Sequence, residues 1–235
     1  MRNFFIFDGI NSRDYGVYIS GSGVFDAPAR RGEVVQIPGR NGDLFLDEGS
    51  YNNVELKYPA FIVRNFKANI AGLRNMLISK SGYCRLQDSY HPEEYRMARY
   101  AGGLETTPLA NLKAANFDLI FDCSPQRFLI SGEDKITFYS SGSIYNPTEQ
   151  DAKPLIRVYG NGLIVIGTTS VTVTQADTYT DLDCDMQEAY KGGTLKNQYV
   201  VLSGNDYPVL QPGSNTIAVG SGISRIEITP RWWRL

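Results

Sequence analysis

Short runs of apolar and β-branched residues, separated by polar and glycine-rich stretches, recur along the second half of the chain. They occur at residues 155–159, 163–166, 171–174, 199–202, 216–219 and 223–228. Runs of this length and composition are typical of strands, and several short strands at close spacing indicate a β-sandwich. The first two segments flank Gly160, Asn161 and Gly162, a turn sequence that predicts a β-hairpin.

Residues 65–80 depart from the β pattern. Their apolar residues recur at spacings of four, three and four, which places one stripe on a helix: Phe66, Ile70, Leu73 and Leu77. Asn65 stands where an N-cap is expected, and Gly82 provides a stop signal. The stripe could pack on a sheet of its own domain or line a subunit contact, and we expect the first.

A second hairpin is predicted at residues 34–46. Residues 34–37 are rich in β-branched side chains, Pro38 and Gly39 interrupt the strand, and a new strand begins at Leu44. Asn41 and Gly42 predict the turn, because both tolerate positive φ. Further along, strands are expected near residues 95–100 and at 117–121, on either side of an irregular excursion.

Glycine, serine and proline gather between the two halves, in residues 131–147. Such composition is typical of a domain boundary. We therefore expect two domains, residues 1–132 and 133–235. The predicted fold class is mainly β with one amphipathic helix: an N-terminal β-sandwich-like domain that carries the helix, followed by a C-terminal β-sandwich.

Composition limits the partners. A chain of 235 residues can bury a core without a disulfide or metal. Charged residues make up 20% of the chain and the net charge is −2, which argues against nucleic acid as the main partner. Arg96 and Arg99 form the only local basic cluster of note, and we expect them in a solvated loop.

The cysteines and the N-terminus indicate the compartment. Cys84, Cys123 and Cys184 are far apart and form no Cys-x-x-Cys pair, so we expect buried free thiols in a reducing compartment. The apolar run before Asp8 is too short for a signal peptide or a membrane helix. We expect folding in the cytoplasm, no secretion signal and no membrane insertion.

The sequence offers little for catalysis. His91 is the only histidine, so any nucleophile–histidine pair would need it, and we expect a surface histidine without a partner. It also lacks the second histidine or paired cysteines that a zinc site requires. We expect no enzyme activity, no cofactor and no metal, and we assign no catalytic or binding residue.

Two further motifs need an interpretation. Asp181, Asp183 and Asp185 resemble the start of a calcium loop, but Met186 occupies the position of the turn glycine. We expect instead a strand whose carboxylates share a solvent face, with Leu182 and Cys184 pointing inward. Trp232 and Trp233 would face opposite sides of a strand. We favour core and interface packing for them over sugar binding.

Four segments resemble, in order, motifs of the distal tail (Dit) proteins of long-tailed phages (siphophages) and their prophage remnants. The first, residues 7–19, contains the Ser-x-Asp-Tyr-Gly turn at residues 12–16. The second is the hairpin sequence of residues 37–51. The third is the strand with a Cys-x-Pro exit at residues 117–125. The fourth is residues 207–217 with the ending 230–235.

The resemblance implies a virion structural protein of the tail tip. It implies that the N-terminal domain forms a hexameric ring, single or stacked in two, and that the C-terminal sandwich is galectin-like or similar to a carbohydrate-binding module. The implied partners are the tail tube protein, a tail-associated lysin or fibre, and a receptor-binding protein. The interface residues stay unassigned. The alternative is a carbohydrate-binding protein that acts through the C-terminal sandwich.

Overall fold

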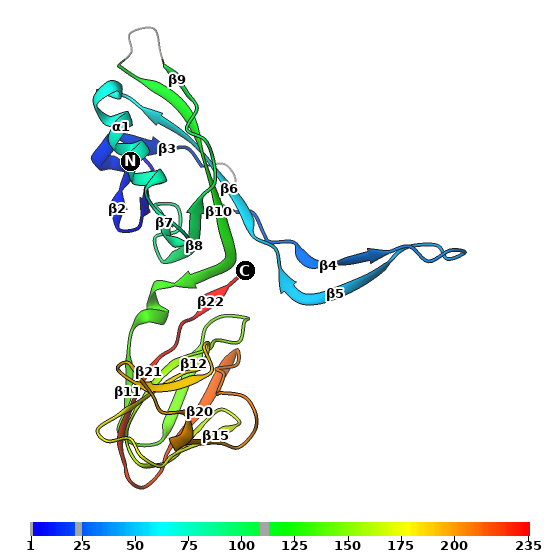
Figure 1. Cartoon of the computed structure of the whole chain (residues 1–235), viewed down its shortest axis with the longest axis vertical. Coiled ribbons are helices and arrows are strands. Elements are labelled where there is room, and N and C mark those ends of the chain that lie inside the picture. The colour runs from blue at the N-terminus through cyan, green and yellow to red at the C-terminus, as the bar shows by residue number, and fades with distance from the viewer. Residues whose placement is uncertain (1, 22–24, 109–112) are drawn as a thin grey trace. The chain divides into compact units, whose positions relative to one another are not determined.

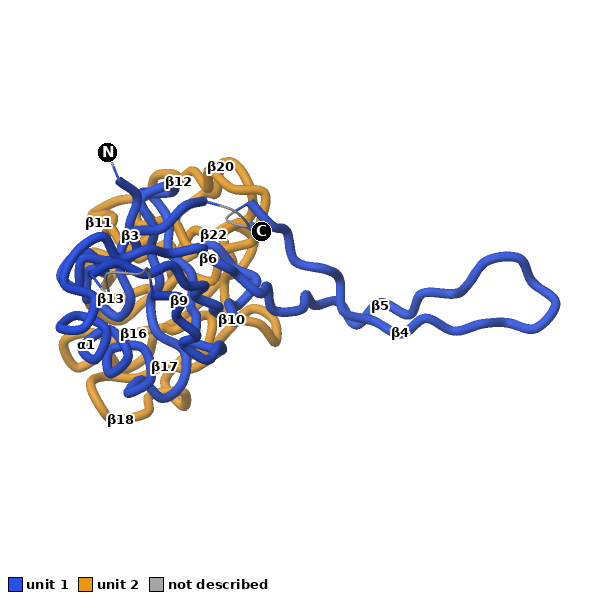
Figure 2. Tube along the Cα trace, turned by 90° about the horizontal axis from the view of Figure 1, so that it is seen from above, with its two compact units in different colours: residues 1–127, 235 blue, residues 128–234 orange. Residues whose placement is uncertain are grey.

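The computed structural model describes all residues except 1, 22–24 and 109–112. The chain forms two compact units, residues 1–127 with Leu235 and residues 128–234 (Figures 1 and 2). The division follows Arg127, five residues before the predicted boundary at Gly132. Residues 128–132 bond to the end of the second unit: the amide of Leu129 donates to the carbonyl of Trp232 (2.9 Å), and that of Arg231 to Gly132 (2.8 Å).

The main sheet of unit 1 has the order β2-β1-β7-β8-β10-β6-β3, with β9 beside β10. A separate sheet contains β4 and β5. The bounds are β1 Phe5–Phe7, β2 Ile10–Asn11, β3 Val17–Ile19, β4 Arg30–Val35, β5 Leu44–Tyr51, β6 Val54–Ile62, α1 Phe66–Ile78, β7 Cys84–Asp88, β8 Glu94–Tyr100, β9 Thr106–Pro108 and β10 Ala115–Leu129. A 3-10 helix, Ser12–Tyr15, lies between β2 and β3.

Helix α1 packs inside unit 1, as its apolar stripe predicts. Phe66, Leu73 and Leu77 are buried in the same core as the inward-facing residues of β6 and β10, and Ile70 packs against that core. Asn65 has the expected position but not the expected cap. It adopts a left-handed conformation (φ 54°) and its side chain makes no capping hydrogen bond. The first helical amide, of Phe66, donates instead to the carbonyl of Lys113 (3.2 Å).

Strand β10 is longer than predicted and does not end at the Cys-x-Pro sequence. Its inward residues stay buried as far as Cys123, which continues the alternation that includes Leu119 and Phe121. The ladder between β10 and β6 ends at the pair Cys123–Val54. Pro125 therefore follows that ladder, where its missing N–H removes none of these hydrogen bonds.

Unit 2 is a β-sandwich, which confirms the predicted fold for this half. One sheet has the order β11-β21-β13-β16-β17-β18 and the other β12-β20-β14-β15-β19. Their inward residues share one core, which includes Ile156, Ile164, Ile217 and Ile226. The bounds are β11 Ile136–Phe138, β12 Gly142–Asn146, β13 Leu155–Gly160, β14 Gly162–Ile166, β15 Thr169–Val173, β16 Thr180–Asp183, β17 Glu188–Lys191, β18 Thr194–Leu195, β19 Val200–Leu202, β20 Gly213–Val219, β21 Ile223–Thr229 and β22 Trp233–Arg234.

The hairpin predicted around Asn161 is wrong, because β13 and β14 belong to different sheets. The segment crosses from one sheet to the other beside a second crossing, between β20 and β21. The two crossings approach closely: the amide of Asn161 donates to the carbonyl of Gly222 (3.1 Å). A Cβ on Gly160, which has a φ of 108°, would lie 2.2 Å from that same oxygen. Glycine is required here for close backbone approach, not for a hairpin turn.

Candidate interaction surfaces

Strands β4 and β5 form an arm, defined here as residues 30–51, that projects from unit 1 (Figure 2). The predicted hairpin is present, with Val35 paired to Leu44. Its large apolar residues are solvent-exposed: Val34 by 60%, Phe45 by 46%, Leu46 by 49% and Leu44 by 38%. Exposed apolar residues that cluster on one element are characteristic of interaction surfaces.

The arm is apolar on both faces. Val34 pairs with Phe45, and the neighbouring pair of Val35 with Leu44 points to the opposite side. On the first face the Phe45 ring lies over Gly32, where a Cβ would stand 2.5 Å from the ring. An isolated two-stranded hairpin is only marginally stable in water. The arm therefore has the character of a segment that becomes buried on both sides in an assembly.

The turn at the end of the arm differs from the predicted one. The amide of Arg40 donates to the carbonyl of Ile37 (3.2 Å), and Gly39 has a φ of 82°. Proline at the second position and a positive-φ glycine at the third match a type II turn. Gly42 also has positive φ, at 81°, whereas Asn41 does not. The two strands are thus joined by a loop of residues 36–43 and not by a two-residue Asn-Gly turn.

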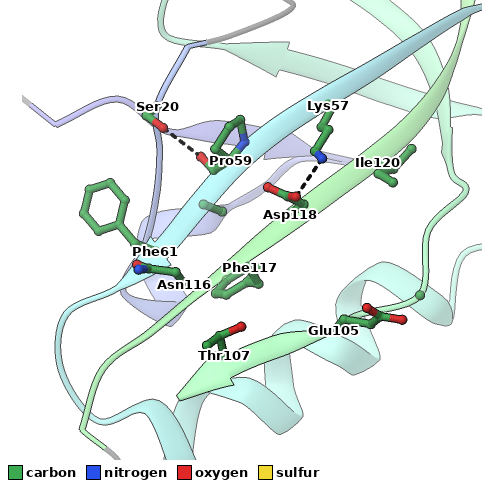
Figure 3. A pocket seen from close by; sticks show the side chains of 12 residues that line it. Ser20, Lys57, Pro59, Phe61, Glu105, Thr107, Asn116, Phe117, Asp118 and Ile120 are labelled. Carbon is green, nitrogen blue, oxygen red and sulfur yellow. Dashed lines mark hydrogen bonds and ion pairs between the residues drawn. The ribbon is translucent and has the colours of Figure 1, made fainter. Parts of the chain in front are cut away.

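A groove of about 740 Å³ lies on the face of unit 1 opposite α1 (Figure 3). Its lining comes mainly from the outward residues of β6 and β10, including Phe61 and Ile120. Lys57 and Asp118 form an ion pair across the two strands (2.7 Å), and the hydrogen bond to Asp118 raises the pKa of Lys57. Because the two charges neutralise one another, this pair adds no net charge to the groove.

His91 is partly buried and has neighbours, contrary to the sequence expectation. Its ring packs edge-on against Phe25 at 5.2 Å between centroids, and Nδ1 lies 3.7 Å from the carboxylate of Asp88. Asp88 accepts the hydroxyl of Tyr58 (2.7 Å) and the backbone amides of Tyr90 and His91. Burial first, and then Asp88, raises the pKa of Tyr58 well above its usual value. These bonds stabilise the turn after β7.

The basic pair is not in a solvated loop. Arg96 and Arg99 lie on β8 and face opposite sides of the sheet. Arg96 is buried, and burial lowers the pKa of its guanidinium. Arg99 is exposed and its Nε donates to Asp122 at 2.8 Å. The sequence predicted a strand near Tyr95–Tyr100. Because side chains alternate between the two faces of that strand, β8, Arg96 is buried while Arg99 is exposed.

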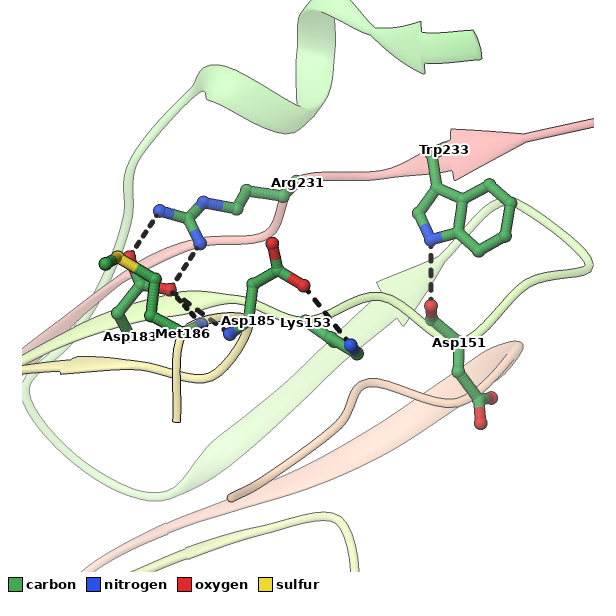
Figure 4. A network of polar contacts seen from close by, with 7 residues as sticks. All are labelled: Asp151, Lys153, Asp183, Asp185, Met186, Arg231 and Trp233. Atoms are coloured by element: carbon green, nitrogen blue, oxygen red, sulfur yellow. Dashed lines mark hydrogen bonds and ion pairs between the residues drawn. The ribbon is translucent and has the colours of Figure 1, made fainter. Parts of the chain in front are cut away.

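The three aspartates of residues 181–185 do not share a solvent face. Asp181 and Asp183 are buried, and each makes a bidentate pair with an arginine. Asp181 pairs with Arg157 (2.6 and 2.9 Å). Asp183 pairs with Arg231 (2.7 and 2.9 Å) (Figure 4). Leu182 and Cys184 point inward as expected. Asp185 is exposed and contacts Lys153 at 3.2 Å. Among the described residues, no three His, Cys, Asp or Glu side chains are grouped as ligands for a metal.

The two tryptophans divide as expected. Trp232 is buried in the core of unit 2, and Trp233 is half-buried with its indole Nε1 donating to the carbonyl of Asp151 at 2.9 Å (Figure 4). Both tryptophans therefore make their contacts within unit 2.

All three cysteines are free thiols. Cys123 and Cys184 are buried, and Cys84 is half-buried.

The arm is the feature that sequence reasoning recognised as a hairpin but missed as a surface. The available signal was the uninterrupted run Leu44, Phe45 and Leu46 opposite Val34 and Val35. A strand with one buried face alternates between apolar and polar residues, so consecutive apolar residues indicate a strand covered on both faces.

No helix among the described residues has the length and apolar character needed to cross a membrane.

The main sheet with its covering helix, the arm and the β-sandwich of unit 2 together give the chain the fold of the phage distal tail, or Dit, proteins. Over its whole length it is similar to the crystal structure of the Dit protein of phage SPP1, with a TM-score of 0.72, 14% sequence identity and 100% of both chains covered. That protein is described as a paradigm of the hub adsorption apparatus in phages that infect Gram-positive bacteria.

A second similar structure is a chain of the phage p2 baseplate in its activated conformation with strontium. The TM-score is 0.51 at 10% identity, covering 100% of this chain and 98% of that one. These likenesses confirm the resemblance to distal tail proteins at the level of the fold. No protein-family model and no curated protein sequence matches the chain.

Proposed function

We propose that this protein is a structural, non-enzymatic component of the tail tip of a long-tailed phage or prophage, where copies of unit 1 form a hexameric hub ring. The arm carries this proposal. It exposes apolar residues on both faces, which a protein that functions as a monomer has no reason to keep. The similarity in fold to SPP1 Dit over the full length supports the same role.

Ring closure explains why the arm stands apart from its own sheet. In a cyclic oligomer, one surface of each copy contacts a different surface of the next, and the rotation closes the ring. A projecting hairpin suits this geometry because it reaches the neighbour with apolar faces and with free backbone groups on its edges. The arm would thus be buried between protein surfaces only after assembly.

The finer assignments follow from the hub role. The ring would join the tail tube protein to a tail-associated lysin or fibre, and receptor-binding protein would attach to the same hub. One ring or two stacked rings would serve equally as such a connector. The protein would be at the tail tip of the virion and in the host cytoplasm during assembly.

The experiment measures the native mass of the full chain and images it by negative-stain microscopy, for the wild type and two variants. Phe45→Ser changes the arm, and Leu163→Ser changes an equally exposed apolar residue of unit 2, since both side chains are 46% exposed. We expect hexameric rings for the wild type and for Leu163→Ser, and a shift toward monomer for Phe45→Ser. Rings that are equally stable in both variants would contradict the role of the arm.

Carbohydrate binding by unit 2 is the second candidate, and the exposure of Tyr139 (74%) and Tyr145 (68%) is the observation that favours it. Other tyrosine faces are occupied by the protein itself: the Arg225 guanidinium lies 3.7 Å from the Tyr159 ring centroid. A glycan array with the wild type and Tyr145→Ala tests this candidate. Glycan binding that Tyr145→Ala abolishes would support it, and a blank array at millimolar glycan would remove it.

A further inference from the structure

Unit 2 contains an open pocket of about 430 Å³ that the hub role does not use. Its lining consists of Asp177, Tyr179, Lys191, Gly192, Thr194 and Lys196. The first two precede β16, the next three belong to β17, β18 and their connection, and Lys196 directly follows β18. A volume of this size is within the usual range for a small-molecule site, although this pocket is lined by polar groups.

The β17–β18 hairpin positions three of these residues. Lys191 pairs with Thr194, and Gly192 and Gly193 form the two-residue turn between them. Gly192 has a φ of 58°, as such a turn requires. Beyond Thr194, the amide of Lys196 donates to the carbonyl of Ala189 (2.7 Å), which fixes the backbone from which its side chain extends.

Two ammonium groups converge on one carboxylate in this pocket. Lys196 Nζ lies 2.9 Å and Lys191 Nζ 4.0 Å from the same oxygen of Asp177. The hydrogen bond from Lys196, and then its charge, lowers the pKa of Asp177. The three side chains together therefore leave an excess of one positive charge. Lys196 is held with its side chain only 12% exposed, whereas that of Lys191 is 29% exposed.

The aromatic residue of the pocket is already covered by cations. The Arg157 guanidinium lies 4.2 Å and the Lys191 ammonium 5.5 Å from the Tyr179 ring centroid. Arg157 is neutralised by its bidentate bond to Asp181, so it adds no free charge. With its ring occupied, Tyr179 is not a platform for a sugar. Recognition here would depend on charge and hydrogen bonding.

We propose that this pocket binds the phosphate group of a small or polymeric ligand. A phosphate is tetrahedral and offers several oxygens, which two lysines and the Thr194 hydroxyl can approach from different sides. Lysine binds phosphate as a point charge, whereas bidentate recognition of a planar carboxylate is the role of arginine. Unit 2 uses arginine for carboxylates in this way, in the pairs Arg157–Asp181 and Arg231–Asp183. The proposal is independent of the hub ring.

The test is isothermal titration of the full chain at low ionic strength with three probes. Inorganic phosphate and poly(glycerol phosphate) carry the group, and glycerol is the neutral control. Saturable binding of both anions supports the proposal and indicates a phosphodiester polymer as the source. Binding of inorganic phosphate alone supports it with a free phosphate as the source. Equal heats for glycerol, or no saturable binding of either anion, would overturn it.

Variants separate the pocket from general charge effects. Lys191→Gln should weaken phosphate binding about tenfold, the value of one charge-assisted hydrogen bond. Asp177→Asn should strengthen it, because the competing carboxylate is removed and both ammonium groups become available. Lys153→Gln, an exposed lysine of unit 2 paired with Asp185, is the control and should leave affinity unchanged. Loss of affinity in Asp177→Asn, or an equal loss in Lys153→Gln, would overturn the assignment.

Discussion

Replacement of Asp183 by asparagine tests one of the buried ion pairs of unit 2. Asp183 is 3% exposed and accepts two hydrogen bonds from Arg231, as well as the amides of Asp185 (3.1 Å) and Met186 (3.2 Å). Asparagine keeps the shape but directs an NH₂ group at the guanidinium and leaves that charge unpaired. Breaking a buried pair in this way costs about 3–5 kcal/mol.

The expected loss is slightly below that range. The Arg231 side chain is 34% exposed, so water can solvate part of the released charge. We expect Asp183→Asn to lower the free energy of unfolding of unit 2 by about 2–3 kcal/mol. Asp185→Asn is the matched control. Its side chain is 64% exposed and its lysine partner is also exposed, so the change should stay within about 0.5 kcal/mol.

Urea unfolding followed by tryptophan fluorescence is the assay. Both tryptophans of the chain, Trp232 and Trp233, are in unit 2, so the signal reports that unit alone. With a slope of about 2 kcal/mol/M, the middle of the typical range, Asp183→Asn should lower the midpoint by roughly 1–1.5 M. Equal midpoints for Asp183→Asn and Asp185→Asn would refute the reasoning.

The pH dependence gives an independent check of the same pair. Burial raises the pKa of Asp183, but the hydrogen bonds from Arg231 and Met186 outweigh it, and the net pKa is lowered. A lowered folded pKa means that the stabilisation is present above the unfolded value of about 3.9 and is lost as pH falls through the folded value. The difference between wild type and Asp183→Asn should therefore be constant near neutral pH and shrink below about pH 4. A difference that acid leaves unchanged would contradict the ion-pair account.

Two further predictions concern the core of the fold. Gly160→Ala should destabilise unit 2 by about 3 kcal/mol or more in the same urea assay, because it adds strain at positive φ and a clash with the Gly222 carbonyl. Gly204→Ala is the control and should have little effect, because the space around Gly204 is open. Burial raises the pKa of the Cys123 thiol to about 12 and also raises that of Cys184, so both should resist iodoacetamide at neutral pH until the protein unfolds. Mass spectrometry of the native protein would contradict this if either cysteine were alkylated as fast as Cys84.

Local patterns predicted elements well and their partners poorly. The apolar stripe from Phe66 to Leu77 predicted α1 correctly, because the helical period can be read from residues that are close together in the sequence. The sequence Gly160-Asn161-Gly162 is equally compatible with a hairpin and with a crossing between sheets. The difference depends on Gly222, which lies far along the chain but meets this segment in space. No local pattern contains that information.

The charged residues show the same limit. Asp181 and Asp183 alternate with apolar residues, which correctly placed Leu182 and Cys184 in the core. Their burial depends on Arg157 and Arg231, which come from other strands or segments. The pocket at Lys191 and Lys196 was missed for a related reason, because Asp177 and Tyr179 complete it from outside the hairpin. Pairings between distant segments are set by the fold and not by spacing.

The native mass of the purified full chain, with images of the particles, tests the central claim most directly. The account predicts a hexameric ring with a central pore, and it predicts that Phe45→Ser shifts the mass toward the monomer while Leu163→Ser does not. A wild-type protein that stays monomeric at every concentration measured, with a mass that Phe45→Ser leaves unchanged, would contradict self-assembly through the arm.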